Sequence, residues 1–127
     1  MTSDNVPERG DVVWLDYDAD PAGHEQGGRR PALTLSSVAY NRTVGLALFC
    51  PLTHQVKGYP FEVAVPSGSA ATGVILADQV KSLDWRERQA DFLCKLEAET
   101  VNEAVGKTLA LLDPDGVFGG FEAPPGD

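Results

Sequence analysis

The sequence predicts one mainly β domain with some α structure: a small β-barrel on which a single late helix packs. Seven short segments have the alternation or the β-branched content of strands, and one later segment changes to helical spacing. Many short strands joined by tight turns, followed by a helix, are typical of such a barrel. At 127 residues the chain can bury one core without disulfides or a metal.

The first predicted strand is Asp11–Tyr17, where β-branched and aromatic residues follow the turn residue Gly10. A polar, glycine-containing loop follows at Asp18–Arg30, and loops of this length in compact domains are often functional. The remaining predicted strands are Pro31–Ser36, Val44–Pro51, Phe61–Val65, Gly73–Ala77, Val80–Leu83 and Asp91–Leu96. We expect turns at Tyr40-Asn41-Arg42 and Ser67-Gly68-Ser69, and we expect Phe92, Cys94 and Leu96 to share one strand face.

Helical spacing begins after the last strand. Apolar residues recur every three or four positions, which predicts an amphipathic helix over Ala98–Leu112 that ends at Asp113-Pro114. Glycine and proline are frequent in residues 113–127. We therefore expect a single domain in residues 1–112 and a disordered tail in residues 113–127.

The composition argues against several classes of protein. No apolar run reaches the roughly 18 residues of a membrane span, and the N-terminus lacks the basic and apolar regions of a signal peptide. We therefore expect a cytoplasmic protein with no membrane partner. Cys50 and Cys94 are isolated, so we expect reduced thiols and neither a metal nor another cofactor.

The formal net charge of −9 is unevenly distributed. Residues 29–88 contain seven basic and four acidic side chains, whereas the two flanks contain three basic and fifteen acidic ones. A locally basic surface can attract phosphate, because salt screens each charge beyond about 8–10 Å. Acidic flanks that only improve solubility explain the same distribution, so charge alone leaves both interpretations open.

Three segments carry residue types that suit work on a phosphate. In Gly27-Gly28-Arg29-Arg30-Pro31 the glycines allow a close backbone approach, and the arginines present permanently charged, planar donors. The second segment begins at Thr53, just past a predicted strand, where a hydroxyl can point into a groove. The third is Ala77-Asp78-Gln79-Val80-Lys81-Ser82.

In their order and spacing, these segments resemble the MazF/PemK family of toxin endoribonucleases. The resemblance rests on Pro7-x-x-Gly10-Asp11-Val12-Val13-Trp14-Leu15-Asp16, Glu25-Gln26-x-Gly28-x-Arg30-Pro31, Thr53-x-Gln55-x-Lys57-Gly58-Tyr59-Pro60-Phe61-Glu62-Val63 and Ala77–Ser82. It covers residues 7–112 and implies the SH3-like barrel of CcdB-like and PemK-like toxins, assembled as a homodimer. It also implies a partner, a cognate MazE-like antitoxin with an acidic C-terminal segment.

The activity that the resemblance implies is metal-independent cleavage of single-stranded RNA, including mRNA, at short motifs. In such enzymes the RNA 2′-OH attacks its adjacent phosphate and leaves a 2′,3′-cyclic phosphate and a 5′-OH. Arg30 matches the family's catalytic Arg and Thr53 its catalytic Thr, and both residue types can stabilise the charge that develops on the phosphate. The residues expected to bind RNA are Gly28, Arg29, Gln55, Lys57, Asp78, Gln79, Lys81 and Arg86.

The proton acceptor stays open at this point. Some family members are thought to use an Arg two residues before the Asp-Gln pair, but this chain has Leu76 there. Glu25 is one catalytic candidate, and His24 and His54 are others because their pKa range suits proton transfer. Exposed loop positions for the histidines, and pairing of Glu25 with an arginine, explain these residues as well.

Two other functions compete with RNA cleavage. One is a noncatalytic toxin that resembles the gyrase poison CcdB, and the other is a plain SH3-like module that binds a protein. Both leave the loop from Gly28 to Arg30 without a chemical task, and neither explains the segment that begins at Thr53.

Overall fold

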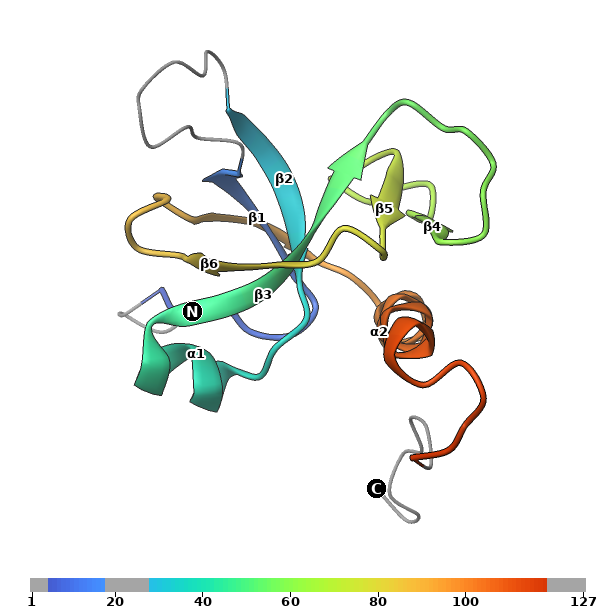
Figure 1. The fold of residues 1–127 in the computed structure, drawn as a ribbon. Coiled ribbons are helices and arrows are strands. Elements are labelled where there is room, and N and C mark those ends of the chain that lie inside the picture. The colour runs from blue at the N-terminus through green and yellow to red at the C-terminus, as the bar shows by residue number, and fades with distance from the viewer. Residues whose placement is uncertain (1–4, 18–27, 119–127) are drawn as a thin grey trace.

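The computed structural model describes residues 5–17 and 28–118 (Figure 1). The predictions for His24, Glu25 and Gly27, and for the tail from residue 119 onward, lie outside the described residues. Within them, the elements in chain order are β1 (Asp11–Asp16), β2 (Arg29–Thr34), α1 (Val38–Val44), β3 (Leu46–Thr53), β4 (Glu62–Ala64), β5 (Val74–Leu76), β6 (Lys81–Asp84), β7 (Asp91–Lys95) and α2 (Ala98–Leu112).

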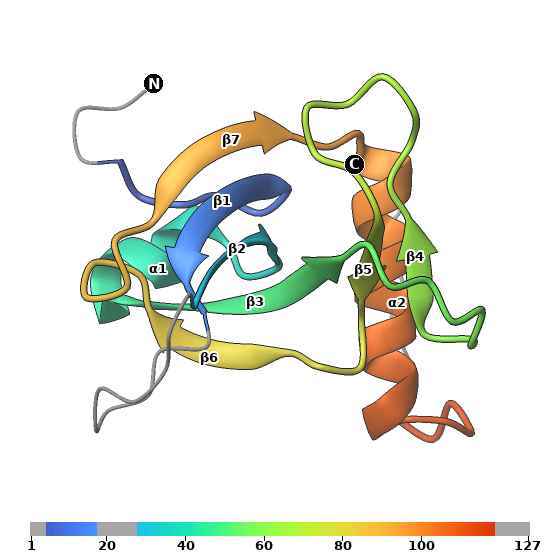
Figure 2. The ribbon, with the colours of Figure 1, turned by 90° about the horizontal axis from the view of Figure 1, so that it is seen from above.

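The strands form one antiparallel sheet in the order β4-β5-β3-β2-β1-β7, and β6 also pairs with β3. Figure 2 shows the strongly curved strands and α2 alongside β4 and β5. A mainly β chain with a C-terminal helix is therefore confirmed. Within the described residues the path of paired strands has two ends, β4 and β7, so the sheet is open and the expected closed barrel is not confirmed.

Strand β3 pairs with three other strands of the sheet. One edge pairs with β2, and the other edge pairs first with β6 and then with β5. The last two residues of β3 lie opposite β5, where Leu52 faces Ile75 and Thr53 faces Val74. The end of β3 thus pairs with the β4–β5 hairpin, and the residues just before it pair with the second half of β2.

Two apolar clusters cover the two faces of the sheet. On β1, Val12 belongs to one cluster, whereas Val13 and Leu15 belong to the other. Burial on both faces explains why β1 is apolar along most of its length. Cys50 is buried in the first cluster, where desolvation raises its pKa to about 12, and both cysteines are free thiols, as expected. No helix within residues 5–17 and 28–118 is long and apolar enough to cross a membrane.

The turn predicted at Tyr40-Asn41-Arg42 is wrong, because these residues lie inside helix α1. The Ser37 side chain accepts a hydrogen bond from the Tyr40 N–H at the start of α1, and Gly45 ends it with a φ of 84°. Asn41 does not act as a turn residue, because its buried amide donates to the carbonyl oxygens of Pro7 and Ser36. Tertiary hydrogen bonds thus override a local turn preference.

The expected alternation along β7 also fails at one position. Phe92 has 61% of its surface exposed, whereas Leu96 is buried. The pairing with β1 moves from Val12–Cys94 to Val13–Phe92, so β7 contains one extra residue at this bulge. A bulge reverses the alternation beyond it, and Phe92 therefore points away from the face that carries Leu96.

Candidate active site

The start of β2 and the end of β3 bring Arg30 and Thr53 together. The two strands pair from Thr34 opposite Phe49 to Ala32 opposite Pro51, and Arg30 and Thr53 each lie two residues beyond the last of these pairs. Both residues line a cavity of about 190 Å³. The described residues that line it are Arg30, Thr53, Gln55, Lys57, Tyr59, Glu62, Leu76 and Gln79.

Backbone pairing and local hydrogen bonds fix both central residues. Arg30 lies opposite Leu15 of β1, so pairing with β1 holds the backbone of β2 at this residue. The Thr53 hydroxyl oxygen accepts a hydrogen bond from the Gln55 N–H at 3.1 Å. This bond leaves the hydroxyl proton of Thr53 able to donate to a ligand in the cavity.

A short turn before β4 supplies another wall of the cavity. The carboxylate of Glu62 accepts hydrogen bonds from the N–H groups of Lys57 at 2.8 Å and Gly58 at 2.9 Å. The Tyr59 hydroxyl donates to Asp78 Oδ1 at 2.8 Å, and this bond raises the pKa of Tyr59. The turn that carries Lys57 and Tyr59 at the cavity is therefore held by several hydrogen bonds.

Three of the eight predicted RNA-binding residues line the cavity. Gln55, Lys57 and Gln79 line it together with the two predicted catalytic residues. Asp78 does not line it but contacts its wall through Tyr59.

The other predicted residues lie outside the lining. Arg29 donates to Asp16 Oδ1 at 3.1 Å and to Asp91 Oδ2 at 2.9 Å. Lys81 lies over the Tyr17 ring at 4.8 Å, and Arg86 lies over the Trp85 ring at 4.7 Å. Gly28 directly precedes β2. Any contact of these residues with RNA stays a prediction.

Among the described residues that line the cavity, Glu62 carries the one carboxylate, and none is a histidine. Leu76 lines the cavity at the position where some family members carry Arg. His54 lies outside the lining, and its Nε2 is 2.6 Å from the Thr72 hydroxyl. His24 and Glu25 lie outside the described residues. Across the described ranges, no group of three or more His, Cys, Asp or Glu side chains could hold a metal.

The predicted site residues do not include Tyr59, Glu62 and Leu76, which also line the cavity. In the sequence, Glu62 belongs to the motif that begins at Thr53. A signal for it was present, because a glycine at position 58 marks a turn and an acidic residue four positions later can accept its N–H groups.

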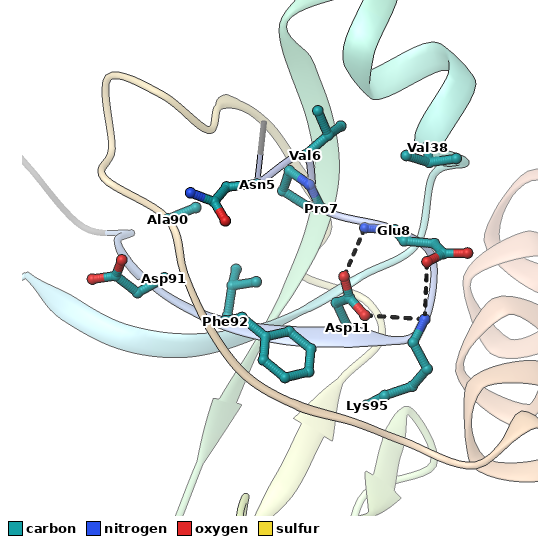
Figure 3. Close-up of a pocket in the computed structure, with 11 residues that line it drawn as sticks. Asn5, Val6, Pro7, Glu8, Asp11, Val38, Ala90, Asp91, Phe92 and Lys95 are labelled. Atoms are coloured by element: carbon teal, nitrogen blue, oxygen red, sulfur yellow. Dashed lines mark hydrogen bonds and ion pairs between the residues drawn. The ribbon is translucent and has the colours of Figure 1, made fainter. Parts of the chain in front are cut away.

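A larger cavity of about 870 Å³ lies elsewhere, beside the N-terminal segment and β7 (Figure 3). None of the predicted site residues that the structure describes lines it. Lys95 in its wall is bound by two carboxylates, Asp11 at 3.0 Å and Glu8 at 3.5 Å, and Asp91 adds a third acidic group. Because its charges are mainly negative, this cavity does not suit a phosphate.

The chain is similar to proteins whose family is known. The family model of PemK-like, MazF-like toxins of type II toxin–antitoxin systems matches residues 8–112. The Escherichia coli K12 endoribonuclease toxin MazF is 52% identical over 90 residues, which cover 71% of this chain and 79% of that protein. The Escherichia coli endoribonuclease PemK is 34% identical over 110 residues, or 83% of this chain and 81% of its relative.

Solved structures give the same result. The crystal structure of MazF (Form-I) from Deinococcus radiodurans is 51% identical, with a TM-score of 0.78, and the match covers 86% of this chain and 98% of that one. A MazE-MazF structure (Form-II) from the same organism is 47% identical, with a TM-score of 0.76, over 86% of this chain and 97% of that one.

Proposed function

This chain belongs to the family of PemK-like, MazF-like toxins of type II toxin–antitoxin systems and is an endoribonuclease toxin, and we propose that Arg30 and Thr53 carry its chemistry. One observation supports this assignment above all others. The two residues that match the family's catalytic pair come from different strands and line one cavity. The proposed toxin domain is residues 1–112, which contain the matched range 8–112.

The proposed reaction is transfer of the phosphate within single-stranded RNA. The 2′-oxygen forms a bond to the adjacent phosphorus as the bond to the 5′-oxygen breaks, which yields a 2′,3′-cyclic phosphate and a 5′-OH. The proton of the 2′-OH passes to a base, and the leaving 5′-oxygen gains a proton. The Arg30 guanidinium stabilises the negative charge that grows on the nonbridging oxygens, and the Thr53 O–H donates to the same phosphate.

The remaining lining residues suit the binding of an RNA strand. The ammonium of Lys57 can contact a phosphate, and the ring of Tyr59 can stack on an unpaired base. Gln55 and Gln79 offer amide donors and acceptors to base edges. A wall that combines these groups fits single-stranded RNA better than a small anion.

The proposed protein partner is a cognate antitoxin, because the relatives include MazF bound to MazE and a mycobacterial endoribonuclease bound to its cognate antitoxin. We propose that an acidic C-terminal segment of the antitoxin lies against Arg30 and Lys57 in place of RNA. A homodimer remains part of the proposal. Exposed apolar side chains at and beyond the end of α2, Leu112, Val117 and Phe118, offer surface for a protein contact.

The competing functions receive no support from the relatives. The four kinds of curated relative are named as endoribonucleases: MazF, PemK, ChpB and EndoA. A noncatalytic CcdB-like toxin or an SH3-like binding module would not require Arg30 and Thr53 to share a cavity.

Incubation of the purified protein with single-stranded RNA in excess EDTA tests the proposal. We expect cleavage that leaves cyclic phosphate ends, and no cleavage at a position where a deoxyribose replaces the attacking ribose. RNA that stays intact under these conditions, or deoxyribose-containing sites that are still cut, would contradict the proposed reaction.

A further inference from the structure

Glu62 is the acidic residue among the described side chains that line the small cavity. A carboxylate with unoccupied oxygens at this place would repel the phosphates of RNA. Its presence in a cavity that also holds Arg30 and Lys57 therefore requires a physical explanation.

The hydrogen bonds of Glu62 provide one. Its Oε2 accepts the Lys57 N–H at 2.8 Å, and its Oε1 accepts the Gly58 N–H at 2.9 Å. Gly58 has a φ of +83°, a conformation that lets successive N–H groups converge on one anion. The carboxylate thus fills an anion site formed by the turn's own backbone.

Glu62 is itself firmly placed. Its N–H donates to the Tyr59 carbonyl at 3.1 Å, and its carbonyl accepts from the Lys107 Nζ of α2 at 3.0 Å. It also begins β4, opposite Leu76 of β5. The carboxylate therefore connects the sheet and α2 to the turn that carries Lys57 and Tyr59.

We propose that Glu62 is a positioning residue for RNA binding: its carboxylate holds the Lys57–Tyr59 turn so that the Lys57 ammonium and the Tyr59 ring stay at the cavity. This inference rests on the proposed function. It also assigns Glu62 a role other than proton acceptor. A base must turn an oxygen toward the 2′-OH, whereas each oxygen of Glu62 accepts a backbone N–H.

The variant Glu62→Gln tests this role, because glutamine has one acceptor oxygen and places an NH2 group against a backbone N–H. We expect the KM for a cleavable single-stranded RNA to rise about tenfold, with kcat within about twofold of wild type, since weakened binding and not chemistry is affected. The pH dependence of kcat keeps its wild-type shape. A hundredfold loss of kcat with a changed pH profile, or an unchanged KM, would overturn the inference.

Gly58→Ala provides an independent test that leaves the carboxylate in place. A Cβ at Gly58 meets no atom within 4 Å, but its φ of +83° strains any other residue, so the turn is disturbed without a clash. We expect a rise in KM in the same direction as for Glu62→Gln. Gly68→Ala is the matched control, with a φ of +91° and open space, and its KM should stay at the wild-type value.

Binding of an RNA with deoxyribose at the cleaved nucleotide separates this inference from the proposed function. The positioning role alone would be refuted if wild type cleaves RNA and both Glu62→Gln and Gly58→Ala bind this probe as tightly as wild type does. Wild type that cleaves no RNA would refute the proposed function, and loss of probe binding in both variants would still support the role of the turn. A melting curve for each variant identifies any that does not fold.

Discussion

Arg29 and Arg30 are consecutive residues of β2, yet their side chains have opposite surroundings. Arg30 lines the cavity with Thr53, whereas Arg29 forms ion pairs with Asp16 of β1 and Asp91 of β7. Neighbouring side chains on a strand point to opposite faces, so one arginine can face a ligand while the other joins three strands. The two arginines of this motif thus have separable tasks.

Replacing Arg29 tests this division. We expect Arg29→Ala to lower the free energy of unfolding by about 0.5–1 kcal/mol, because its ion pairs are partly exposed. It should reduce the rate of RNA cleavage by less than tenfold. Urea denaturation and single-turnover cleavage measure the two effects, and a loss of cleavage without any loss of stability would contradict the structural role.

The Thr53 hydroxyl is expected to stabilise the transition state. Thr53→Val keeps the shape of the side chain and removes the donor, and removal of one such donor typically lowers kcat by about 10²–10³-fold. Thr53→Ser should retain most of the activity because the O–H remains. Steady-state cleavage rates distinguish the two variants, and a Thr53→Val rate equal to that of wild type would contradict the role of the hydroxyl.

Gly73 holds the β4–β5 hairpin close to Thr53. A Cβ at Gly73 would lie 2.3 Å from the Thr53 carbonyl oxygen, and the residue has a φ of +99°. We expect Gly73→Ala to lower the melting temperature and to reduce kcat by displacing Thr53. The matched control is Gly68→Ala in the same hairpin, which has a similar φ and meets no atom within 4 Å. Equal effects of both variants would attribute the loss to backbone strain alone.

The Tyr59–Asp78 hydrogen bond predicts a pH dependence. This bond raises the pKa of Tyr59 above its ordinary value of 10.0. Since the folded value is raised, the contribution of this pair to stability is fully present below pH 10 and is lost as the pH rises through the raised value. In an NMR titration of the Tyr59 ring carbons, Asp78→Asn should lower the pKa of Tyr59. Asp84→Asn, which removes a carboxylate at another turn, should leave it unchanged.

Much of this site could be predicted from sequence because it consists of local motifs at strand ends. Arg30 and Thr53 match catalytic positions in the motifs of the family that the sequence resembles, and the periodicity predicts α2 over Ala98–Leu112. Helix α1 was missed because the buried hydrogen bonds of Asn41 join it to Pro7, which is remote in sequence. The exposure of Phe92 follows from a bulge in the pairing of β7 with β1. The carboxylate of Glu62 accepts backbone N–H groups of a turn, and the hydrophobic periodicity of the sequence does not indicate such hydrogen bonds.

The most direct test of the central claim is the single-turnover rate of RNA cleavage by Arg30→Ala in EDTA, measured beside wild type and Arg29→Ala on the same single-stranded RNA. We predict a loss of at least 10²–10³-fold for Arg30→Ala, about the effect of removing one donor to the developing charge, with a melting temperature close to that of wild type. A rate for folded Arg30→Ala within tenfold of wild type would contradict the assignment of Arg30 to the chemistry of this cavity.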